Sequence, residues 1–500
     1  MKNENNLQKF HNKAIYDYSL REIWPQEVLT ESKLLSDEKI VSEDFNELPF
    51  VTIDGEDAKD FDDAIFCKLI PDGFKLYVAI ADVSFYVKEN SAIDMEARAR
   101  ATSTYMFRKV LPMLPEKLSN DLCSLKEGVL RKTLIVKINF DKAGNIEKYT
   151  FHRSEIKSCA RLTYNKVEDF LENKINLNGE KYKESLDSAK ILMSKLLERR
   201  AERGALDFEL DEPYMRFDRE GKIQELKNRT RLMSHKLIEE FMLSANICAA
   251  DFLNKNYSQG IYRVHDYPEN YKIDRLSQIL KRRNINWEGS IEDVDNLNIF
   301  IKNLSKRSDK SILNAVVLQS MQRAEYSTKE IGHFGLKYKK YTHFTSPIRR
   351  YPDLIVHRMI IAKLNKLNYE IEDLDDLLVH CSERERSSEF ASKQVQQNML
   401  CSYAANFRGQ IFDGFITGVK DFGVFVDIPK LYTSGLLHIT ELPKDNYKYN
   451  ARDKILSGKR RANTFCLGDK ISVGIDNVME LEGKISPVSY THLTLPTNGC

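Results

Sequence analysis

The chain has 500 residues, of which 42% are hydrophobic and 30% charged, and its formal net charge at pH 7 is +2. This length exceeds what one hydrophobic core usually serves, so we expect two or more domains. The near-neutral charge argues against a protein that coats polyanions over its whole surface but permits a local basic channel. No apolar run reaches membrane-spanning length and no secretory signal begins the chain, so we expect a cytoplasmic protein without a membrane partner.

The N-terminal part of the chain changes character near Pro49. Residues 1–48 are polar with short amphipathic pieces, and we interpret them as a remnant or linker. PFVTI, AIFCKL and KLYVAIADVSFYV are typical of strands, the last two joined by the turn signal PDG. A later hairpin contains Gly144 and Asn145. The first domain is therefore expected to open with a β-rich sheet.

The segment between the first two expected strands is crowded with carboxylates. Six of the ten residues from Asp54 to Asp63 are acidic, and Lys59 is the one cation among them. Apolar residues on both sides predict a loop pinned between buried strands. Like charges this close oppose folding unless a cation is bound. Hard oxygen ligands without cysteine or histidine favour Mg²⁺ or Mn²⁺ over zinc, a chemistry that suits phosphoryl transfer.

Two other interpretations of the acidic segment stay open at this point. The first is a solvated acidic loop, which is the usual identity of an arbitrary acidic run. The second is a structural calcium loop, which fits poorly because Gly55 directly follows the first aspartate instead of standing at the sixth position. The apolar flanks favour a metal site over both.

Helical patterns dominate the middle of the chain. ESLDSAKILMSKLLERRAERG ends at Gly204, while SHKLIEEFMLSANICAADFLNK and SILNAVVLQSMQRAEY place apolar residues on one stripe. In YTHFTSPIRRYPDLIVHR, we expect Pro347 in the first turn of a helix, with Arg349 and Arg350 beside it. A helix start with hydroxyls and arginines binds phosphate, although an ordinary capped helix with surface arginines has the same pattern.

Composition shifts again after Ala405. GQIFDGFITGVKDFGVFVDI alternates apolar and polar residues with repeated glycines, which predicts a small β-barrel. The ending PVSYTHLTLPTNGC is rich in Ser and Thr and differs in composition from the charged chain before it. We interpret residues 487–500 as a non-native tail and expect the barrel to lack its final strand.

Taken in order, the segments TIDGEDAKDFDDA, ADVSFYV, LPMLPEKLSNDLCSL, HKLIEEFMLSANICAA, YRVHDYP and HFTSPIRRYPDL resemble the RNase II/RNase R family of processive 3′-to-5′ exoribonucleases, its RNase R members above all. The resemblance implies an α+β fold, with a mixed β-sheet and helical RNB catalytic domain over residues 49–402. An incomplete S1-type OB-fold barrel over residues 405–486 would follow. The cold-shock domains that precede the catalytic domain in RNase R would be absent.

The resemblance also implies an activity and its catalytic residues. The family hydrolyses the terminal phosphodiester of single-stranded RNA to nucleoside 5′-monophosphates by two-metal chemistry, in RNA decay and quality control. Asp54, Asp60, Asp62 and Asp63 occupy the catalytic aspartate positions and are the expected ligands of Mg²⁺, for which Mn²⁺ could substitute. Arg349 matches the arginine that neutralises charge at the scissile phosphate. RNA is the expected partner, and the protein is expected to be a monomer.

Further residues are expected to contact RNA. Two family aromatics that stack on terminal bases map onto Tyr105 and Phe208, and stacking contributes about 1 to 3 kcal/mol per base. Alternation along strands would leave about half of the barrel aromatics in the core. The expected RNA-binding residues are Tyr105, Phe208, Glu239 and Arg350 in the catalytic domain, and Phe412, Phe422, Phe425 and His438 in the barrel.

The main alternative is a catalytically inactive RNA-binding regulator with the same fold. Relatives that have lost the chemistry usually lose aspartates, whereas all four stand in this chain. Two departures from the family pattern concern the surroundings of the site. Ala101 and Met106 replace residues usual in the segment around Tyr105, and residues 391–395 lack an acidic residue common in relatives.

Overall fold

The computed structural model describes most of the chain. The described residues are 2–36, 43–206, 213–218, 223–228, 231–282, 310–451, 453–460 and 463–489, with the single positions 285, 287, 297, 300, 303, 304 and 307. Among them, no helix has both the length and the apolar character that crossing a membrane requires. The seven described cysteines form no disulfide, and five of them are buried.

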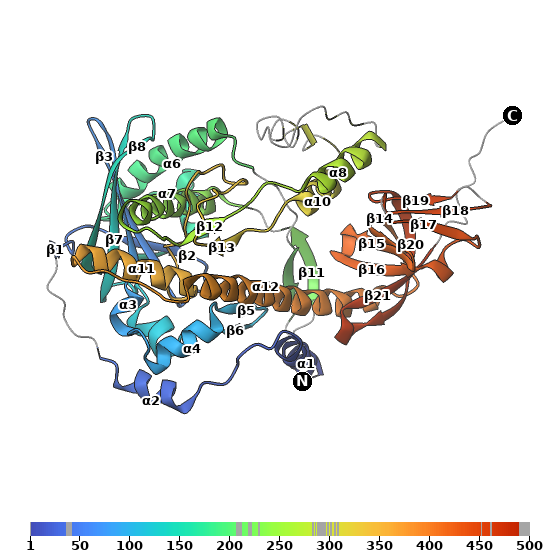
Figure 1. The fold of residues 1–500 in the computed structure, drawn as a ribbon, viewed down its shortest axis with the longest axis horizontal. Helices are drawn as coiled ribbons and strands as arrows, with labels where there is room; N and C mark the ends of the chain where they lie inside the picture. The colour runs from blue at the N-terminus through green and yellow to red at the C-terminus, as the bar shows by residue number, and fades with distance from the viewer. Residues whose placement is uncertain are drawn as a thin grey trace.

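A seven-stranded sheet forms the centre of the larger domain, in the order β1-β8-β7-β4-β3-β2-β9 (Figure 1). Its antiparallel middle consists of β3 (Asp63–Ile70), β4 (Gly73–Ala81), β7 (Leu130–Asp141) and β8 (Ile146–Lys157). At one edge β2 (Val51–Asp54) pairs in parallel with β9 (Ala160–Thr163), and at the other β1 (Glu43–Asp44) pairs in parallel with β8.

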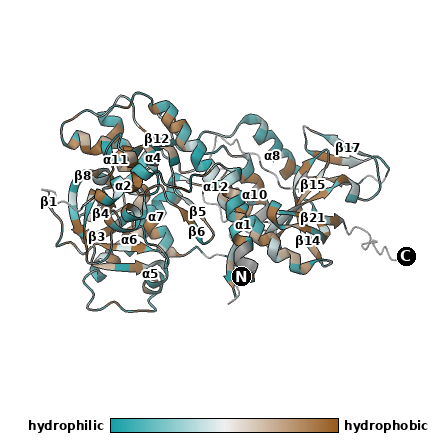
Figure 2. Ribbon diagram, turned by 90° about the horizontal axis from the view of Figure 1, so that it is seen from below, coloured by the Kyte–Doolittle hydropathy of each residue, from teal (hydrophilic) through white to brown (hydrophobic). Residues whose placement is uncertain are grey.

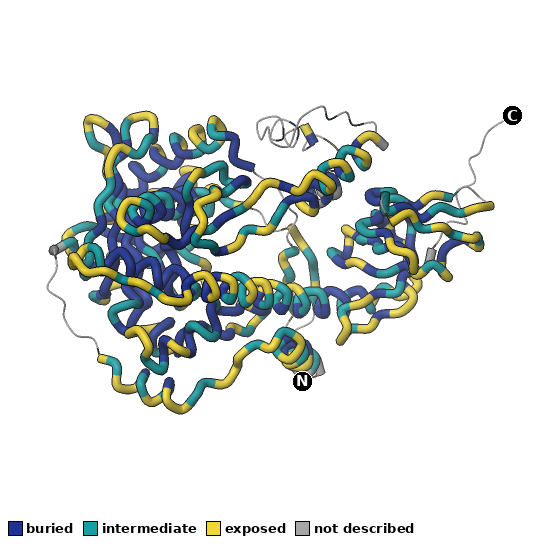
Figure 3. The backbone as a smooth tube through the Cα atoms, viewed as in Figure 1, coloured by how far each residue is buried: buried dark blue, intermediate teal, exposed yellow. Residues whose placement is uncertain are grey.

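Long helices pack against this sheet and against one another. They include α6 (Lys183–Arg203), which contacts β3, and α7 (Met233–Asn256), which contacts β4, β7 and α11 (Tyr351–Leu364). Gly204 ends α6 in a left-handed conformation at φ 78°, as its position after the helical pattern predicted. Every residue of α11 from Tyr351 to Ile361 is buried, so this helix is enclosed by the domain (Figure 3).

Shorter elements complete the domain. The helices are α3 (Val83–Tyr86), α4 (Ala92–Arg100), α5 (Tyr164–Leu171), α8 (Asn270–Arg282) and α10 (Lys310–Ser320). The small strand pairs are β5 (Thr104–Met106) with β6 (Lys109–Leu111), β10 (Pro213–Phe217) with β11 (Ile223–Asn228), and β12 (Tyr262–Val264) with β13 (Glu325–Ser327).

The N-terminal segment, interpreted from sequence as a remnant or linker, contains two packed helices. α1 (Lys2–Asp17) lies along α12 (Leu374–Ala404), with Phe10 and Ala14 buried in a cluster with Ala391. α2 (Gln26–Leu34) packs on α4. The 31-residue helix α12 extends from the sheet region to the C-terminal barrel (Figure 1).

The C-terminal barrel is closed, contrary to the expectation that its final strand is missing. Its strands are β14 (Ile411–Lys420), β15 (Gly423–Ile428), β16 (Thr433–His438), β21 (Lys484–Ser489) and β20 (Lys470–Met479). A side sheet of β17 (Tyr447–Asn450), β18 (Ile455–Gly458) and β19 (Thr464–Phe465) joins it. Hydrophobic residues, coloured brown in Figure 2, occur along the strands of the barrel as they do along the strands of the larger sheet.

The missing-strand prediction was wrong because the change in composition at Pro487 was interpreted as the end of the barrel sequence, whereas β21 continues to Ser489. The structure places Pro487 within β21, opposite Ile475, where the β20–β21 ladder shifts register before Asn477. Such irregular positions accommodate a residue that cannot donate to the ladder. Ile485, on the same strand, is 1% exposed in the barrel core. Residues 490–500 of the proposed tail lie outside the described residues. The predicted α+β architecture with a terminal barrel is otherwise confirmed.

Leu76 tests the contribution of the sheet core to stability. Its side chain is fully buried on β4, so Leu76→Ala should lower the free energy of unfolding by about 2 to 5 kcal/mol. Leu69→Ala is the control, because Leu69 is 52% exposed on the neighbouring strand, and it should change stability by less than about 0.5 kcal/mol. Urea unfolding followed by circular dichroism measures both, and equal effects would contradict the assigned core.

Candidate active site

The acidic loop connects two neighbouring strands at one end of the sheet. β2 ends at Asp54 and β3 begins at Asp63, so the pairing of these strands brings the two ends of the loop together. Between them Phe61 is buried, and its backbone N–H donates to Ser124 Oγ at 3.1 Å. Ser124 Oγ donates in turn to the Lys59 carbonyl at 2.7 Å. The loop is thus pinned between buried strands, as its apolar flanks predicted.

All four predicted aspartates and Arg349 line one open cavity of about 530 Å³. The acidic loop supplies one wall, and α7 and the segment before α11 supply others. The residues that the structure gathers here are Asp54, Asp60, Asp62, Asp63, Tyr105, Tyr164, Ile238, Glu239, Met242, Leu243, Asn246, Tyr341, Thr345, Ser346, Arg349 and Arg350.

The four carboxylates differ in their hydrogen-bond partners. Asp62 Oδ1 accepts from the backbone N–H of Ile348 at 2.9 Å, and its Oδ2 lies 3.8 Å from Nε of Arg349. Asp60 Oδ2 accepts from the Tyr105 hydroxyl at 2.8 Å. By contrast, one buried carboxylate oxygen on each of two residues has no hydrogen-bond partner within the described part of the chain. These atoms are Oδ2 of Asp54 and Oδ2 of Asp63.

Burial makes the charged forms of these carboxylates costly. It raises the pKa of Asp62 to about 8, although Arg349 and the Ile348 N–H oppose the shift. Burial, and then the neighbouring Asp60, raise the pKa of Asp54 to about 6. The pKa of Asp63 is also raised, first by burial and then by Asp54 and Asp62. A bound cation would relieve this cost.

The donor set fits a hard divalent cation. The two unpartnered oxygens belong to Asp54 and Asp63, and oxygen ligands of this kind suit Mg²⁺ or Mn²⁺. In the described ranges, no three or more His, Cys, Asp or Glu side chains form a ready-made metal cage. Mg²⁺ characteristically uses one or two carboxylates and completes its shell with water and phosphate oxygens, so the arrangement remains suitable.

The turn before α11 orients Arg349 toward the cavity. The Arg349 side chain is 44% exposed, and its Nη2 donates to Ser346 Oγ at 3.1 Å. The expectation that Pro347 stands in the first helical turn was wrong, because α11 begins at Tyr351. The fully buried Asp353 accepts from the Ser346 backbone N–H at 2.8 Å, which holds the preceding residues in a turn.

The other residues predicted to bind RNA in this domain have different positions. Tyr105 and Glu239 reach the cavity. Arg350 lines it too, but its side chain is 15% exposed and donates to Asp353 at 2.7 Å, so it holds the turn together. Phe208 lies outside the described residues. Glu240, the residue next to Glu239, is 3% exposed and paired with Arg200.

Tyr164 is a cavity residue for which the sequence predicted no role. Its ring lies against His235, with centroids 4.2 Å apart. The parallel pairing of β2 with β9 places Asp54 opposite Thr163, directly before Tyr164. The sequence signal was an aromatic residue following a buried strand, which points to this site only once the strand pairing is known.

The residues predicted for the barrel lie apart from the cavity, on the domain at the far end of α12 (Figure 1). Phe422 is 42% exposed, and its ring meets that of Phe425 edge-on with centroids 6.3 Å apart. His438 is also exposed. Phe412 contradicts its predicted stacking role, because strand alternation turns it into the barrel core, where it is 6% exposed.

Comparison with known proteins identifies two domains. A family model for the RNB domain matches residues 42–366, and one for the S1 RNA binding domain matches residues 406–486. The chain is 36% identical to Ribonuclease R of Escherichia coli over 497 residues, covering 94% of this chain and 61% of that protein. It is 38% identical to Ribonuclease R of Thermotoga maritima over 479 residues, covering 92% of this chain and 67% of that protein.

Solved structures share the fold. Mycoplasma genitalium RNase R in complex with ribose methylated single-stranded RNA matches with a TM-score of 0.90 and 28% identity, over 95% of this chain and 77% of that one. Yeast Ssd1, a pseudonuclease, matches with a TM-score of 0.65 and 20% identity, a likeness that concerns the fold alone. The chain spans about three fifths of the length of the E. coli relative, 61%.

The raised pKa of Asp62 predicts how stability depends on pH. Between the ordinary pKa of 3.8 and about 8, the folded state binds this proton more tightly than the unfolded state. The metal-free protein should therefore lose stability as pH rises through this window. Asp62→Asn should reduce this loss, so Tm should fall less between pH 5 and pH 8 in the variant than in the wild type.

Thermal melts in chelator at pH 5 and pH 8 measure the effect. Asp72→Asn is the matched control, because Asp72 is exposed in the β3–β4 turn. A pH dependence that is equal in the wild type and in both variants would contradict the electrostatic account of the cavity.

Proposed function

The chain belongs to the ribonuclease R family of RNB-domain proteins, and from this premise we propose that it is a 3′-to-5′ exoribonuclease that shortens single-stranded RNA to nucleoside 5′-monophosphates. One observation carries the proposal. The unpartnered carboxylate oxygens of Asp54 and Asp63 and the guanidinium of Arg349 share one open cavity. That arrangement combines oxygen ligands for a cation with a positive group for a phosphate.

Asp54 and Asp63 would hold Mg²⁺, or Mn²⁺ in its place, and Asp60 and Asp62 would complete the negative side of the site. When bound, such ions supply Lewis-acid polarisation of a phosphoryl oxygen and lower the pKa of water. The raised pKa values of Asp54 and Asp62 support this assignment, because crowded buried carboxylates favour a cation.

The chain's own residues would bind and orient the scissile phosphate. Arg349 is the exposed cation of the cavity wall, and Ser346 Oγ fixes the direction of its guanidinium. Its charge would stabilise negative charge that develops on the phosphate in the transition state. The backbone N–H of Ile348 holds Asp62 in place beside it. The hydroxyl of Tyr105 holds a proton at Asp60 Oδ2.

The barrel would hold RNA upstream of the cavity. Phe422, Phe425 and His438 form a partly exposed aromatic group on it, and stacking on such rings is tolerant of sequence. The RNA-bound M. genitalium relative supports RNA as the ligand. The four aspartates and Arg349 all come from one chain, which supports action as a monomer. RNA decay and quality control in the cytoplasm would be the corresponding role.

Retention of the four aspartates and Arg349 argues against a purely binding function. A 5′-labelled RNA incubated with Mg²⁺ should shorten stepwise from its 3′ end, and chelator should stop the reaction. Asp62→Asn should reduce the rate by at least about 100-fold, a loss typical of removing one transition-state interaction. RNA binding, measured by fluorescence anisotropy, should change by less than about twofold.

Two results would contradict the proposal. RNA that stays intact with the wild type in both Mg²⁺ and Mn²⁺ would favour the inactive RNA-binding regulator. Shortening from the 5′ end would show a nuclease of the opposite polarity. A parallel loss of binding and cleavage in Asp62→Asn would instead assign a structural role to that residue.

Phe422 and Phe412 provide a matched pair for the barrel. Phe422→Ala should weaken RNA binding by about 1 to 3 kcal/mol, because it removes an exposed stacking ring, and should leave Tm unchanged. Phe412→Ala should lower Tm, because it empties part of the barrel core, and reduces RNA binding only in proportion to unfolding. Anisotropy and thermal melts separate the two effects. Unchanged affinity in Phe422→Ala would mean that the Phe422 ring does not hold RNA.

A further inference from the structure

The segment that follows α4 controls two groups that face the aspartates. Ala101 ends α4 in the left-handed conformation, at φ 59°. The backbone N–H of Ser103 then donates to the carbonyl of Arg349 at 2.9 Å. Two residues further on, Tyr105 places its hydroxyl on Asp60. The path of this segment therefore determines where both the Arg349 backbone and the Tyr105 side chain lie.

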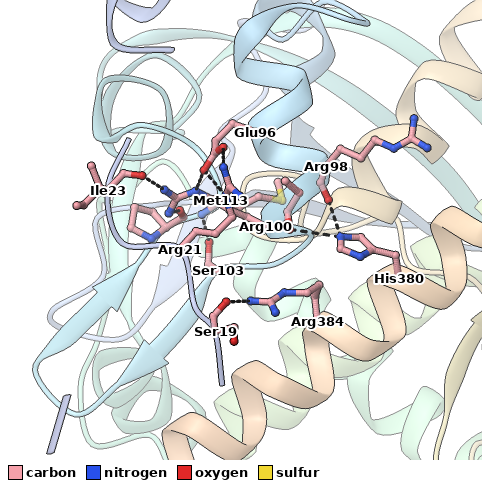
Figure 4. Close-up of polar contacts among 12 residues, drawn as sticks. Ser19, Arg21, Ile23, Glu96, Arg98, Arg100, Ser103, Met113, His380 and Arg384 are labelled. Atoms are coloured by element: carbon pink, nitrogen blue, oxygen red, sulfur yellow. Dashed lines mark hydrogen bonds and ion pairs between the residues drawn. The ribbon is translucent and has the colours of Figure 1, made fainter. Parts of the chain in front are cut away.

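A buried ion network fixes the start of the segment (Figure 4). Arg100, the last residue of α4, is 4% exposed on its side chain and donates from Nε to Glu96 Oε1 at 2.8 Å. Glu96, also 4% exposed, accepts from Arg21 Nε at 2.9 Å and from Arg21 Nη2 at 2.6 Å. The Arg100 guanidinium lies over the Trp24 ring, 3.6 Å from its centroid. One carboxylate thus joins two arginines from separate parts of the chain.

The same network holds the end of the segment, where the chain returns from the β5–β6 hairpin. Arg100 Nη1 donates to the carbonyl of Pro112 at 3.1 Å, and its Nη2 donates to the carbonyl of Ile23 at 3.2 Å. The next backbone N–H, that of Met113, donates to Ser103 Oγ at 2.8 Å. Hydrogen bonds therefore hold residues 101–113 at both ends. The Arg100 guanidinium contributes at both ends and also bonds to the N-terminal segment.

We propose that Glu96 and Arg100 are positioning residues for Arg349 and Tyr105, and that Arg21 makes the segment before α2 part of the same catalytic module. Without the Glu96 charge, Arg100 would be a buried cation lacking its partner. The 101–113 segment would then relax and carry the Arg349 carbonyl with it. A displacement of about 1 Å in a catalytic group can cost as much as 100-fold in rate. The activity measurement rests on the proposed exoribonuclease function.

Glu96→Gln is the direct test, because it keeps the size of the side chain and removes its charge. It should lower kcat by roughly 10-fold or more at temperatures well below its Tm, with KM for RNA within about twofold. Arg21→Ala should act in the same direction but less, because Arg21 is 47% exposed and its loss leaves Glu96 paired with Arg100. Arg98→Gln on the same helix is the control, since Arg98 pairs with Asp373 at the surface, and it should leave kcat unchanged.

A double-mutant cycle shows whether the effect passes through Arg349. In an Arg349→Ala background, Glu96→Gln should lower the single-turnover rate by a smaller factor than in the wild-type background, because the Arg349 guanidinium is gone and only Tyr105 remains to be displaced. Hydrogen exchange supplies a measurement that does not need activity. The amides of Ser103 and Met113 should exchange faster in Glu96→Gln than in the wild type, and should be unchanged in Arg98→Gln.

Either of two results would overturn the inference. One is that Glu96→Gln lowers the rate by the same factor in the Arg349→Ala background as in the wild-type background. The other is unchanged protection of the Ser103 and Met113 amides in Glu96→Gln. If the wild type cleaves no RNA, the proposed function fails, and the exchange of those two amides still decides the positioning role. If Glu96→Gln does not fold, Arg21→Ala decides by the same measurements.

Discussion

The structure is organised around buried carboxylates that the protein itself does not fully satisfy. Asp62 accepts a backbone N–H from Ile348 and Asp60 accepts the Tyr105 hydroxyl, but one buried oxygen on Asp54 and one on Asp63 have no partner within the described part of the chain. Leaving such groups buried without a partner costs free energy of folding. The sheet, the turn before α11 and the segment after α4 all keep these carboxylates close together, and a cation would offset the cost.

That constraint connects distant parts of the chain. The parallel pairing of β2 with β9 sets Tyr164 beside Asp54, while the turn held by Asp353 presents Arg349 to the same cavity. The ion network of Glu96 adds the N-terminal segment to this assembly through Arg21. Rigid elements of this kind keep catalytic groups in place better than free loops do. The barrel stands at the other end of α12 and offers an aromatic surface.

The sequence predicted best the features whose residues are neighbours in the chain. It predicted least well the features that depend on tertiary contacts. The acidic loop was recognisable because its carboxylates and apolar flanks are neighbours in the chain. Arg349 and Arg350 look alike in sequence and both line the cavity, yet the Arg349 side chain is 44% exposed there, whereas Arg350 is held by the buried Asp353. Phe412 and Phe422 likewise have the same side chain, yet Phe412 lies on β14 with its ring in the barrel core, whereas Phe422 is exposed in the turn between β14 and β15.

The central claim is that the Asp54–Asp63 cluster requires a divalent cation. The most direct test is calorimetric titration with Mn²⁺ of protein from which metal and chelator have been removed. Because burial raises the pKa values of Asp54 and Asp62, binding near pH 7 should release protons, so the measured heat should depend on the buffer. We expect one saturable site or more in the wild type and none in a variant with both Asp54→Asn and Asp63→Asn. Equal binding by the two proteins, or no binding by the wild type, would contradict the claim.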